Sequence, residues 1–438
     1  MVGRGIRIGG WLSAALLFGV LGARGASALE PDELSPTDIQ SKSPHFAFKP
    51  AQSKVTAPRP ADGGGASAFG GGVPGIDSLV NFTGQFYSPG LDPNGNPQSV
   101  WYYSMVGNSP ELGGTTTVSA PIIPVKVELL NQEGEVRHVR GARLVSDPKG
   151  LVEGVLQSPV FQNSSFSSSR GPTQYNDAIQ RAEFFSLLDE EEHPWHTLLV
   201  PSVKKERTIK IPYGMYQFAL KADGSCCAYM LIDEGTFGNA LFPPTYPVDN
   251  TTVMGSAELA GDATTKTITT LLFSDIYLYA NGDPTQCCIL GYHTFDFEPG
   301  ATATALPRAY ITIYASWISP GLFGTLADVT ALSHEMAETF NDPFVAFDGV
   351  HNVTPWWLAT GPNGSQCQDV MEVGDVLEIA ADPTYPITLG GFTYHPQTVA
   401  ILPWFEFKKH SHAVGGAYSY PDPTLLTTLS PPEKVNCQ

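Results

Sequence analysis

The chain has 438 residues, of which 42% are hydrophobic and 15% charged, and its formal net charge is −19. This length is enough for one large domain or two interlocked ones. The excess of acidic residues argues against nucleic acid or an anionic membrane as a partner, because both are negatively charged, and it is compatible with divalent cations.

Residues 1–28 have the pattern of a secretory signal peptide. Arg4 and Arg7 form a basic start, an apolar stretch runs from Trp11 to Gly22, and Ala26-Ser27-Ala28 is a small-residue cleavage site. The stretch is short for a membrane span, and no later segment has the roughly 18 uninterrupted apolar residues that a span needs. The sequence therefore predicts a secreted protein, extracellular or periplasmic, without a membrane partner after signal removal. The alternative is an uncleaved N-terminal anchor.

The remaining chain divides by composition. Residues 29–75 are rich in Pro, Gly, Ser and Ala, which predicts a disordered, flexible leader. We expect a β-rich part with two helices over 76–200, a core over 201–422 and a C-terminal tail over 423–438. The predicted class is α+β, with a zincin-like mixed sheet in the core over 201–422.

The predicted elements begin with strands at 100–106 and 115–130, which are rich in β-branched and aromatic residues. A helix is expected at Asp147-Pro148, with Asp as its N-cap and Pro in the first turn, and a second follows Thr173. Further strands are expected at 197–212, 228–233, 267–279, 288–297, 309–317, 392–394 and 399–407.

A helix predicted after Gly324, with Asp328 as its N-cap, carries the most informative pattern of the chain. His334 and Glu338 are four residues apart, so they share one helix face at a separation of about 6 Å and can bind one metal ion. Glu335 projects to the side, where it can act as general base on a metal-bound water. This is the arrangement of the His-Glu-x-x-His peptidase motif, with glutamate replacing the second histidine. The order of strand, loop and motif helix is also that of zincin folds.

The end of this helix is marked by Asn341-Asp342-Pro343. Pro343 disfavours helical geometry at Asp342, and Asn tolerates the left-handed conformation that ends helices, so the helix should stop near Phe340. Asp342 can then fold back as a metal ligand, orient His334, or cap the helix end.

A further ligand is expected from downstream, where acidic residues cluster between Asp369 and Asp375. Glu372 and Asp375 are the leading candidates, and Asp348 and His351 follow because they lie just beyond the helix. One histidine with two or three carboxylates suits Zn²⁺, and also Mn²⁺, Fe²⁺ or Ca²⁺. The added negative charge makes a bound water less acidic, which predicts slow hydrolysis.

Other residues invite weaker interpretations. His293 ends a predicted strand and is either metal-linked or capped by a backbone hydrogen bond, and we favour the second interpretation. Three aromatic residues have two possible interpretations: they line a cleft or, as is more common for such residues, they pack in the core. They are Tyr292, Tyr394 and Trp404.

The six cysteines include two adjacent pairs, Cys226-Cys227 and Cys287-Cys288, besides Cys367 and Cys437. In an exported protein an even count favours disulfides, but six cysteines allow 15 pairings. Adjacent residues of a strand point to opposite faces, so we expect each pair to send one sulfur into the core and one outward.

The stretch from Ser333 to Pro343 resembles the His-Glu-(Ile/Leu)-Ala-Glu-x-x-(Thr/Asn)-(Asn/Asp)-Pro segment of the Exordium family, also called phosphate-induced protein 1. Glu372-Val373-Gly374-Asp375 is similar to the family's Glu-Ile-x-Asp segment. Phe392 to Phe405 resembles its late strand, and Cys288 to His293 resembles its Cys-Gly-x-His element. The similarity covers residues 285–407.

This resemblance implies a secreted protein of the cell wall or extracellular space, and it supports grouping His334, Glu338, Glu372 and Asp375. The biochemical activity of the family is not settled. The family's cysteine after Glu-Ile-x-Asp is absent here, where Leu377 and Glu378 follow Val376, so its disulfide pattern does not transfer.

Two functions remain open. The first is a secreted metal-dependent hydrolase, a zincin-like peptidase acting on peptides or proteins, with Glu335 as general base. Its metal ligands would be His334, Glu338, and Glu372 or Asp342, with zinc expected and Ca or Mn as alternatives. The second is a non-catalytic extracellular protein that uses the same helix as a structural or Ca-stabilised element and binds a cell-wall component or a protein. An accessible metal point favours the first, and a buried one favours the second.

Overall fold

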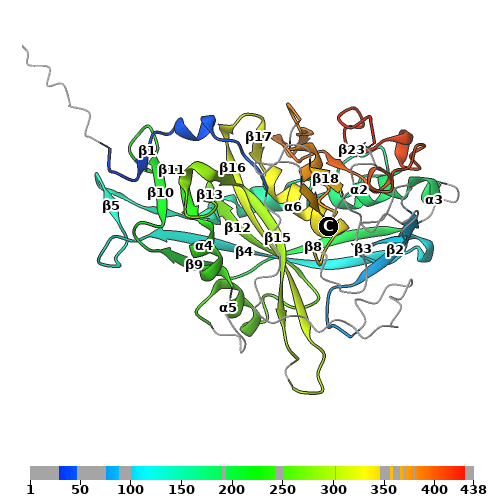
Figure 1. Ribbon diagram of the computed structural model, residues 1–438, viewed down its shortest axis with the longest axis horizontal. Coiled ribbons are helices and arrows are strands. Elements are labelled where there is room, and N and C mark those ends of the chain that lie inside the picture. The colour runs from blue at the N-terminus through cyan, green and yellow to red at the C-terminus, as the bar shows by residue number, and fades with distance from the viewer. Residues whose placement is uncertain are drawn as a thin grey trace, which may run out of the picture. The chain divides into compact units, whose positions relative to one another are not determined.

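The computed structural model describes residues 29–46, 75–87, 100–189, 194–242, 250–300, 302–345, 356–358, 366–368, 371–378 and 380–429. Two mixed sheets, several two-stranded sheets and mostly short helices make up the described fold (Figure 1). This confirms the predicted α+β class with mixed sheets.

The larger sheet has eight strands in the order β15-β16-β12-β4-β7, with β17 paired to β16 and both β8 and β9 paired to β4. Its centre is parallel, because β4 runs parallel to β8, β9 and β12, and β12 runs parallel to β16. The edge strand β15 is antiparallel to β16. The strands are β4 (Thr115–Leu129), β7 (Val145–Ser146), β8 (His196–Val203), β9 (Arg207–Ile211), β12 (Ile268–Ser274), β15 (Gly291–Glu298), β16 (Arg308–Phe323) and β17 (Leu326–Asp328).

The second sheet has five strands in the order β1-β10-β11-β13-β14. They are β1 (Glu33–Leu34), β10 (Tyr216–Leu220), β11 (Cys226–Asp233), β13 (Ile276–Tyr279) and β14 (Cys287–Ile289). Strand β1 pairs in parallel with β10, and Ile39 and Phe46 are buried. The prediction of a flexible leader is therefore wrong for residues 32–46, because edge pairing and two apolar side chains anchor them. Residues 47–74 of that predicted leader lie outside the described residues.

The remaining strands form two-stranded sheets. They are β2 (Asn81–Tyr87) with β3 (Val100–Val106), β5 (His138–Val139) with β6 (Ala142–Arg143), β18 (Trp356–Leu358) with β19 (Gln366–Gln368), β20 (Ile387–Leu389) with β21 (Phe392–Tyr394), and β22 (Val399–Ala400) with β23 (Ser419–Tyr420). The strand predicted over 399–407 ends at Ala400. Pro403 stands in the first turn of a helix instead, where a missing N–H does no harm.

The helices are α1 (Val152–Leu156), α2 (Tyr175–Glu183), α3 (Phe185–Asp189), α4 (Glu234–Leu241), α5 (Val253–Leu259), α6 (Thr330–Asn341) and α7 (Leu402–Phe405). The 3-10 turns are η1 (Asp38–Ser41), η2 (Pro110–Leu112), η3 (Pro148–Leu151), η4 (Pro284–Gln286), η5 (Asp375–Leu377) and η6 (Val414–Gly416). As predicted, the Asp147 carboxylate caps the first turn, accepting the N–H of Lys149 at 2.9 Å. In the described part of the chain, no helix has the length and apolarity of a membrane span.

Helix α6, the predicted motif helix, lies against β15 and β16 of the larger sheet (Figure 1). Leu332, Met336 and Phe340 pack into one apolar cluster with that sheet, and Ala337 faces a second cluster on the other side. Every residue of α6 is buried. Its polar side chains are thus held inside the protein and need partners there.

The start of α6 differs from the prediction, and its end agrees closely. The helix begins at Thr330, and no side chain caps it. Asp328 instead accepts the N–H groups of Val329 at 2.7 Å and His395 at 2.8 Å, which fastens the segment after β21 to the helix start. The helix ends at Asn341, and Asp342 is non-helical.

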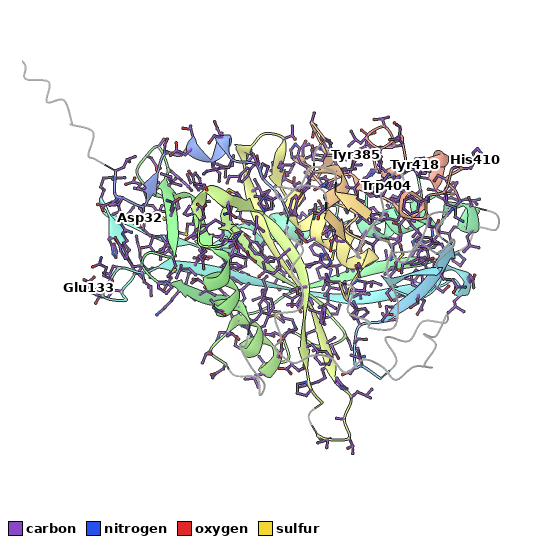
Figure 2. All side chains as sticks on the ribbon, viewed as in Figure 1. Asp32, Glu133, Tyr385, Trp404, His410 and Tyr418 are labelled. Atoms are coloured by element: carbon purple, nitrogen blue, oxygen red, sulfur yellow. A yellow bond between two sulfur atoms is a disulfide. The ribbon has the colours of Figure 1, made fainter. Side chains whose placement is uncertain are left out.

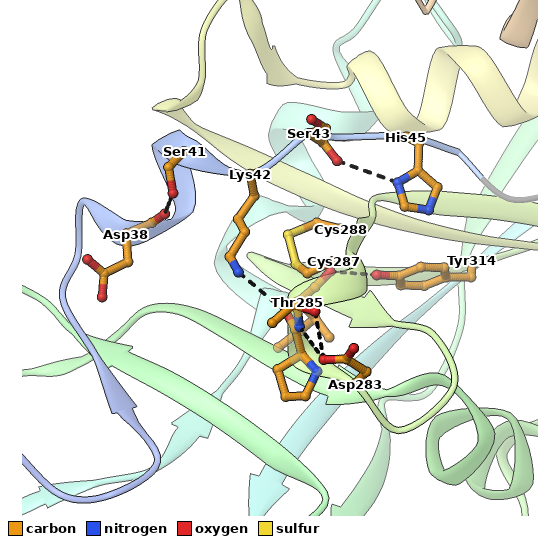
Figure 3. Close-up of a disulfide and its surroundings, with 12 residues drawn as sticks. Asp38, Ser41, Lys42, Ser43, His45, Asp283, Thr285, Cys287, Cys288 and Tyr314 are labelled. Carbon is orange, nitrogen blue, oxygen red and sulfur yellow. Dashed lines mark hydrogen bonds between the residues drawn. A yellow bond between two sulfur atoms is a disulfide. The ribbon is translucent and has the colours of Figure 1, made fainter. Parts of the chain in front are cut away.

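The adjacent cysteines form two disulfides, Cys226–Cys227 and Cys287–Cys288. The expectation of opposite faces is wrong, because each pair is joined to itself. The second disulfide adjoins the N-terminal segment (Figure 3). The backbone N–H of His45 donates to the carbonyl of Cys288 at 2.9 Å, and the N–H of Cys288 donates to the carbonyl of Ser43 at 3.3 Å. The side chains of Cys367 and Cys437 lie outside the described part.

The three aromatic residues that we expected either in a cleft or in the core are core residues. Tyr292, Tyr394 and Trp404 are each no more than 5% exposed. The indole N–H of Trp404 donates to the carbonyl of Thr428 at 3.0 Å, in the C-terminal part labelled in Figure 2.

Candidate metal centre

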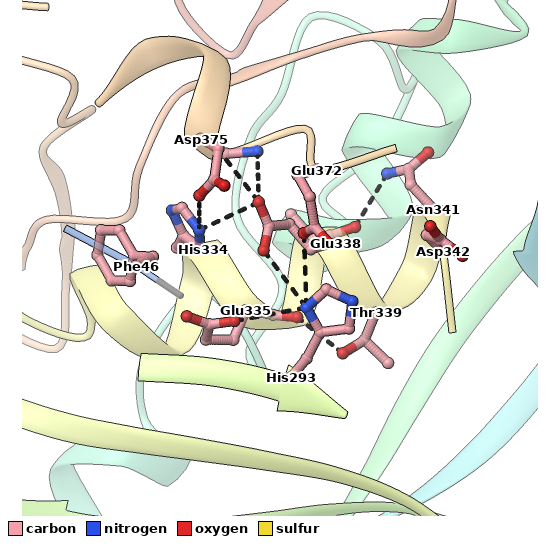
Figure 4. A network of polar contacts seen from close by, with 12 residues as sticks. Phe46, His293, His334, Glu335, Glu338, Thr339, Asn341, Asp342, Glu372 and Asp375 are labelled. Carbon is pink, nitrogen blue, oxygen red and sulfur yellow. Dashed lines mark hydrogen bonds and ion pairs between the residues drawn. The ribbon is translucent and has the colours of Figure 1, made fainter. Parts of the chain in front are cut away.

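The i, i+4 pair of α6 meets a carboxylate from the turn η5. His334 Nε2 lies 3.1 Å from Glu338 Oε1 and 3.3 Å from Asp375 Oδ1 (Figure 4). Glu338 Oε1 also accepts the N–H groups of Gly374 at 3.0 Å and Asp375 at 3.2 Å, which ties η5 to the helix. His334, Glu338 and Asp375 form the first ligand group, with ligand atoms close enough to hold one ion.

A second ligand group consists of His293, Glu338 and Glu372. Alternate residues of a strand face the same side, so His293 of β15 points at α6 together with Phe295 and Phe297. His293 Nδ1 lies 3.4 Å from Glu338 Oε2, 3.7 Å from Glu372 Oε2 and 3.5 Å from Glu335 Oε2 (Figure 4). The interpretation of His293 as a strand cap is wrong, since neither ring nitrogen hydrogen-bonds to a described residue.

Gln397 sets the proton position on His334. Its amide nitrogen donates to the carbonyl of Gly374 at 2.9 Å, so its oxygen is the atom that faces His334 Nδ1 at 2.9 Å. An amide oxygen can only accept, so Nδ1 carries the proton. The lone pair of neutral His334 is therefore on Nε2, directed at Glu338 and Asp375, as metal-ligating histidines are commonly arranged.

The centre contains many polar atoms without hydrogen-bond partners among the described residues. They are both ring nitrogens of His293, Nε2 of His334, both carboxylate oxygens of Glu335 and of Glu372, and Oδ1 of Asp375. None of these residues is more than 5% exposed. Buried polar groups are normally paired, and the ligand atoms within each group are close enough together to hold a cation as their shared partner.

The pKa values of these side chains also indicate that the clustered carboxylates require compensating positive charge. Burial raises the pKa of Glu372 well above its ordinary value, and Glu338 and Asp375 raise it further. Burial raises the pKa of Glu335 to about 7, opposed by the imidazoles. Burial alone would lower the pKa of His293, but Glu335 and Glu338 outweigh it and raise that pKa to about 10. Protons on these side chains thus offset the clustered carboxylates, and a divalent cation can replace them.

The spacing of the ligand atoms fits a metal ion. Zinc lies about 2.0–2.1 Å from nitrogen and oxygen ligands, and tetrahedral angles then put two ligand atoms about 3.3 Å apart. The separations are 3.1 and 3.3 Å in the first group and 3.4 and 3.7 Å in the second. These four separations therefore fit a divalent ion, and all ligand atoms of each group lie within 4.8 Å of one another.

Two glycines make this packing possible. A Cβ on Gly374 would lie 2.5 Å from the imidazole of His334, and a Cβ on Gly291 would lie 2.6 Å from Glu335 Oε1. Any side chain at either position would displace a residue of the centre.

The other predicted ligands are placed as follows. The carboxylate of Asp342 accepts the N–H of Met371 at 3.1 Å, so it holds the segment that carries Glu372 and is in neither ligand group. Asp348 and His351 lie outside the described residues. Sequence reasoning missed Gln397, which stands in an unremarkable stretch and has no motif.

The N-terminal segment covers the centre. The Phe46 ring stacks on the His334 imidazole, with ring centroids 3.6 Å apart, and the Phe46 N–H donates to the carboxylate of Glu378. Two backbone hydrogen bonds hold this segment in place: the N–H of Leu290 donates to the carbonyl of His45, and the N–H of His45 donates to the carbonyl of Cys288. The metal point is consequently buried in the described form.

A third acidic group, of Glu258, Asp296 and Glu298, lies apart from this centre. Asp296 and Glu298 alternate with the helix-facing residues of β15 and so point to the opposite face of the sheet. Arg308 pairs with Glu298 at 2.5 Å, and the group has no histidine.

Comparison with models of known families, with curated proteins and with solved structures gave no match to this chain. A functional assignment therefore has to come from the residues and geometry of the centre.

Proposed function

We propose that the protein is a secreted, metal-dependent hydrolase of the zincin-like peptidase type, with Glu335 as its general base. The observation that carries the proposal is the set of buried ligand atoms gathered around Glu338, which have no hydrogen-bond partners among the described residues. Zinc is the expected ion, because imidazole together with carboxylate suits it, and Mn or Ca are the alternatives.

In this proposal the residues have the following roles. His334 and Glu338 from α6, with Asp375 or Glu372 from the following segment, hold the ion. When bound, the ion supplies Lewis acidity and makes water a better nucleophile. The two carboxylate oxygens of Glu335 have no hydrogen-bond partners among the described residues, and Oε2 lies 3.5 Å from His293 Nδ1. In this proposal Glu335 takes a proton from water and returns it to the leaving amine of a peptide.

Support for the zincin-like type comes from the setting of α6 against a mixed sheet and from the motif itself. The paired carboxylates make the centre more anionic than a three-histidine site, so we expect slower hydrolysis at neutral pH. Export, and a relationship to the Exordium family, remain proposals based on residues 1–28 and 285–407.

Burial of the centre has to be part of this proposal. His334 and Glu335 are both fully buried, so substrate can reach them only if covering segments move, and the segment carrying Phe46 is one that covers His334. We therefore propose that the described form is closed. Residues 43–46 join the body through backbone hydrogen bonds, the bond from the Phe46 N–H to Glu378, and the buried Phe46 ring, so opening has to break these contacts.

The same burial favours a second candidate, a non-catalytic extracellular protein whose metal is structural. In that case the ion would stabilise the fold by neutralising the carboxylates around α6, and residues 43–46 would be a permanent part of the core. Binding to a cell-wall component or a protein would then use another surface.

One experiment separates the two. Metal content and hydrolysis of casein are measured for the mature wild-type chain, Glu335→Gln, and Phe46→Ala. The hydrolase proposal predicts casein cleavage that increases in Phe46→Ala and is lost in Glu335→Gln, with metal content unchanged. Metal in all three proteins and cleavage in none would support the structural role. Glu183→Gln serves as the control, because Glu183 is equally buried and belongs to neither ligand group.

A further inference from the structure

We infer that the centre holds two metal ions, bridged by the carboxylate of Glu338. This inference rests on the proposed function for the presence of a metal, and it deepens that proposal by fixing the number of ions and the bridging ligand.

The bridge follows from how the two ligand groups share Glu338. Oε1 faces His334 Nε2 at 3.1 Å, in the group completed by Asp375. Oε2 faces His293 Nδ1 at 3.4 Å, in the group completed by Glu372. Each oxygen of one carboxylate thus belongs to a different group, and each group adds one imidazole and one further carboxylate.

The orientation of this carboxylate is fixed by the backbone. The N–H groups of Gly374 and Asp375 both donate to Oε1. They hold the plane of the Glu338 carboxylate so that Oε2 points at His293 and Glu372. A bridging carboxylate needs such a fixed plane, because both oxygens must be presented at once.

A single ion would leave the other group unsatisfied. An ion held by His334, Glu338 and Asp375 leaves both nitrogens of His293 and both oxygens of Glu372 buried without hydrogen-bond partners among the described residues. An ion held by the second group leaves His334 Nε2 and Asp375 Oδ1 in the same condition. Two ions give a partner to the atoms that converge in both groups, which are His334 Nε2 and Asp375 Oδ1 in the first and His293 Nδ1 and one Glu372 oxygen in the second.

Charge supports the same count. Four carboxylates converge on the centre, and in the described part their ion pairs are with His293 and His334; they are Glu335, Glu338, Glu372 and Asp375. With these four carboxylates ionised and both imidazoles neutral, one divalent ion would leave a net charge of about −2, and a second ion would remove it.

The direct test is the number of ions bound at equilibrium. The mature full-length chain, freed of metal with a chelator, is dialysed against excess MnCl₂ or ZnCl₂, desalted and analysed for metal per chain. We expect two equivalents for the wild type and for the control Glu183→Gln, and one each for Glu372→Gln and Asp375→Asn. One equivalent in the wild type would overturn the two-ion centre and leave the proposed function standing. No bound metal would overturn both.

A second measurement does not depend on the variants folding. Two Mn²⁺ ions bridged by a carboxylate are magnetically coupled, so the loaded wild type should give an electron paramagnetic resonance spectrum distinct from that of isolated ions. A spectrum of isolated ions at two equivalents would overturn the Glu338 bridge.

Discussion

Phe46 lies face to face on the imidazole of His334, with ring centroids 3.6 Å apart and ring planes inclined by 20°. The first residue belongs to the N-terminal segment and the second to α6, so this stack joins distant parts of the chain at a proposed metal ligand. Because the stack covers the ligand, it should control how easily an ion enters or leaves the centre.

Replacing Phe46 by Ala should open the centre. We expect metal to be lost to a chelator at least several-fold faster, and the free energy of unfolding to fall by about 3 kcal/mol from lost packing. The rate of metal loss is followed with a chromogenic chelator. Phe323→Ala is the matched control, because Phe323 is similarly buried in the same apolar cluster but packs on Tyr277 instead. Equal rates in both variants would show that Phe46 does not gate the centre.

Gln397 should matter for metal affinity although it binds no metal. Gln397→Leu removes the acceptor for His334 Nδ1, so the imidazole proton is no longer fixed on that nitrogen. This change should weaken metal binding about 10–100-fold. Gln397→Glu keeps an acceptor and should bind more tightly than the Leu variant. Competition with a chelator of known affinity measures both. Wild-type affinity in Gln397→Leu would contradict the role assigned to this contact.

Gly374 should not tolerate a methyl group. Its backbone is in the ordinary right-handed region, so alanine is disfavoured only by its contact with His334. We expect Gly374→Ala to lower the free energy of unfolding by about 1–3 kcal/mol and to reduce metal affinity. Gly150→Ala is the control, since a Cβ there meets nothing within 4 Å. Denaturant unfolding with and without metal distinguishes the effect on stability from the effect on metal affinity. A Gly374→Ala protein with wild-type stability and metal affinity would contradict the close approach of Gly374 to His334.

Glu183 provides a test of the fold remote from the metal. It is fully buried, and burial raises its pKa to about 8 from an ordinary 4.5. The folded state therefore keeps a proton that the unfolded state releases, so this contribution to stability is present below pH 4.5 and is lost as the pH rises through 8. Glu183→Gln should gain stability relative to wild type across this window, by roughly 1.4 kcal/mol per pH unit at most. Urea unfolding at several pH values measures the difference, and a constant difference would contradict the buried, protonated carboxyl.

The sequence predicted those parts of the centre that lie close together in the chain. His334, Glu335 and Glu338 follow from helical spacing, and Glu372 and Asp375 from an acidic run just beyond. His293 and Gln397 could not be placed, because they reach α6 from β15 and from the segment after β21, and no local pattern encodes tertiary pairing. The same limit explains residues 32–46, whose composition suits a flexible leader but whose pairing partner is β10.

The central claim is that α6 holds metal through Glu338, and metal content per chain of the purified mature protein tests it most directly. Inductively coupled plasma mass spectrometry is applied to the wild type and to Glu338→Gln after gel filtration in metal-free buffer. The account predicts bound metal in the wild type and its loss in Glu338→Gln, because both ligand groups share that residue. A wild-type protein without metal, or a variant that retains all of it, would contradict the account.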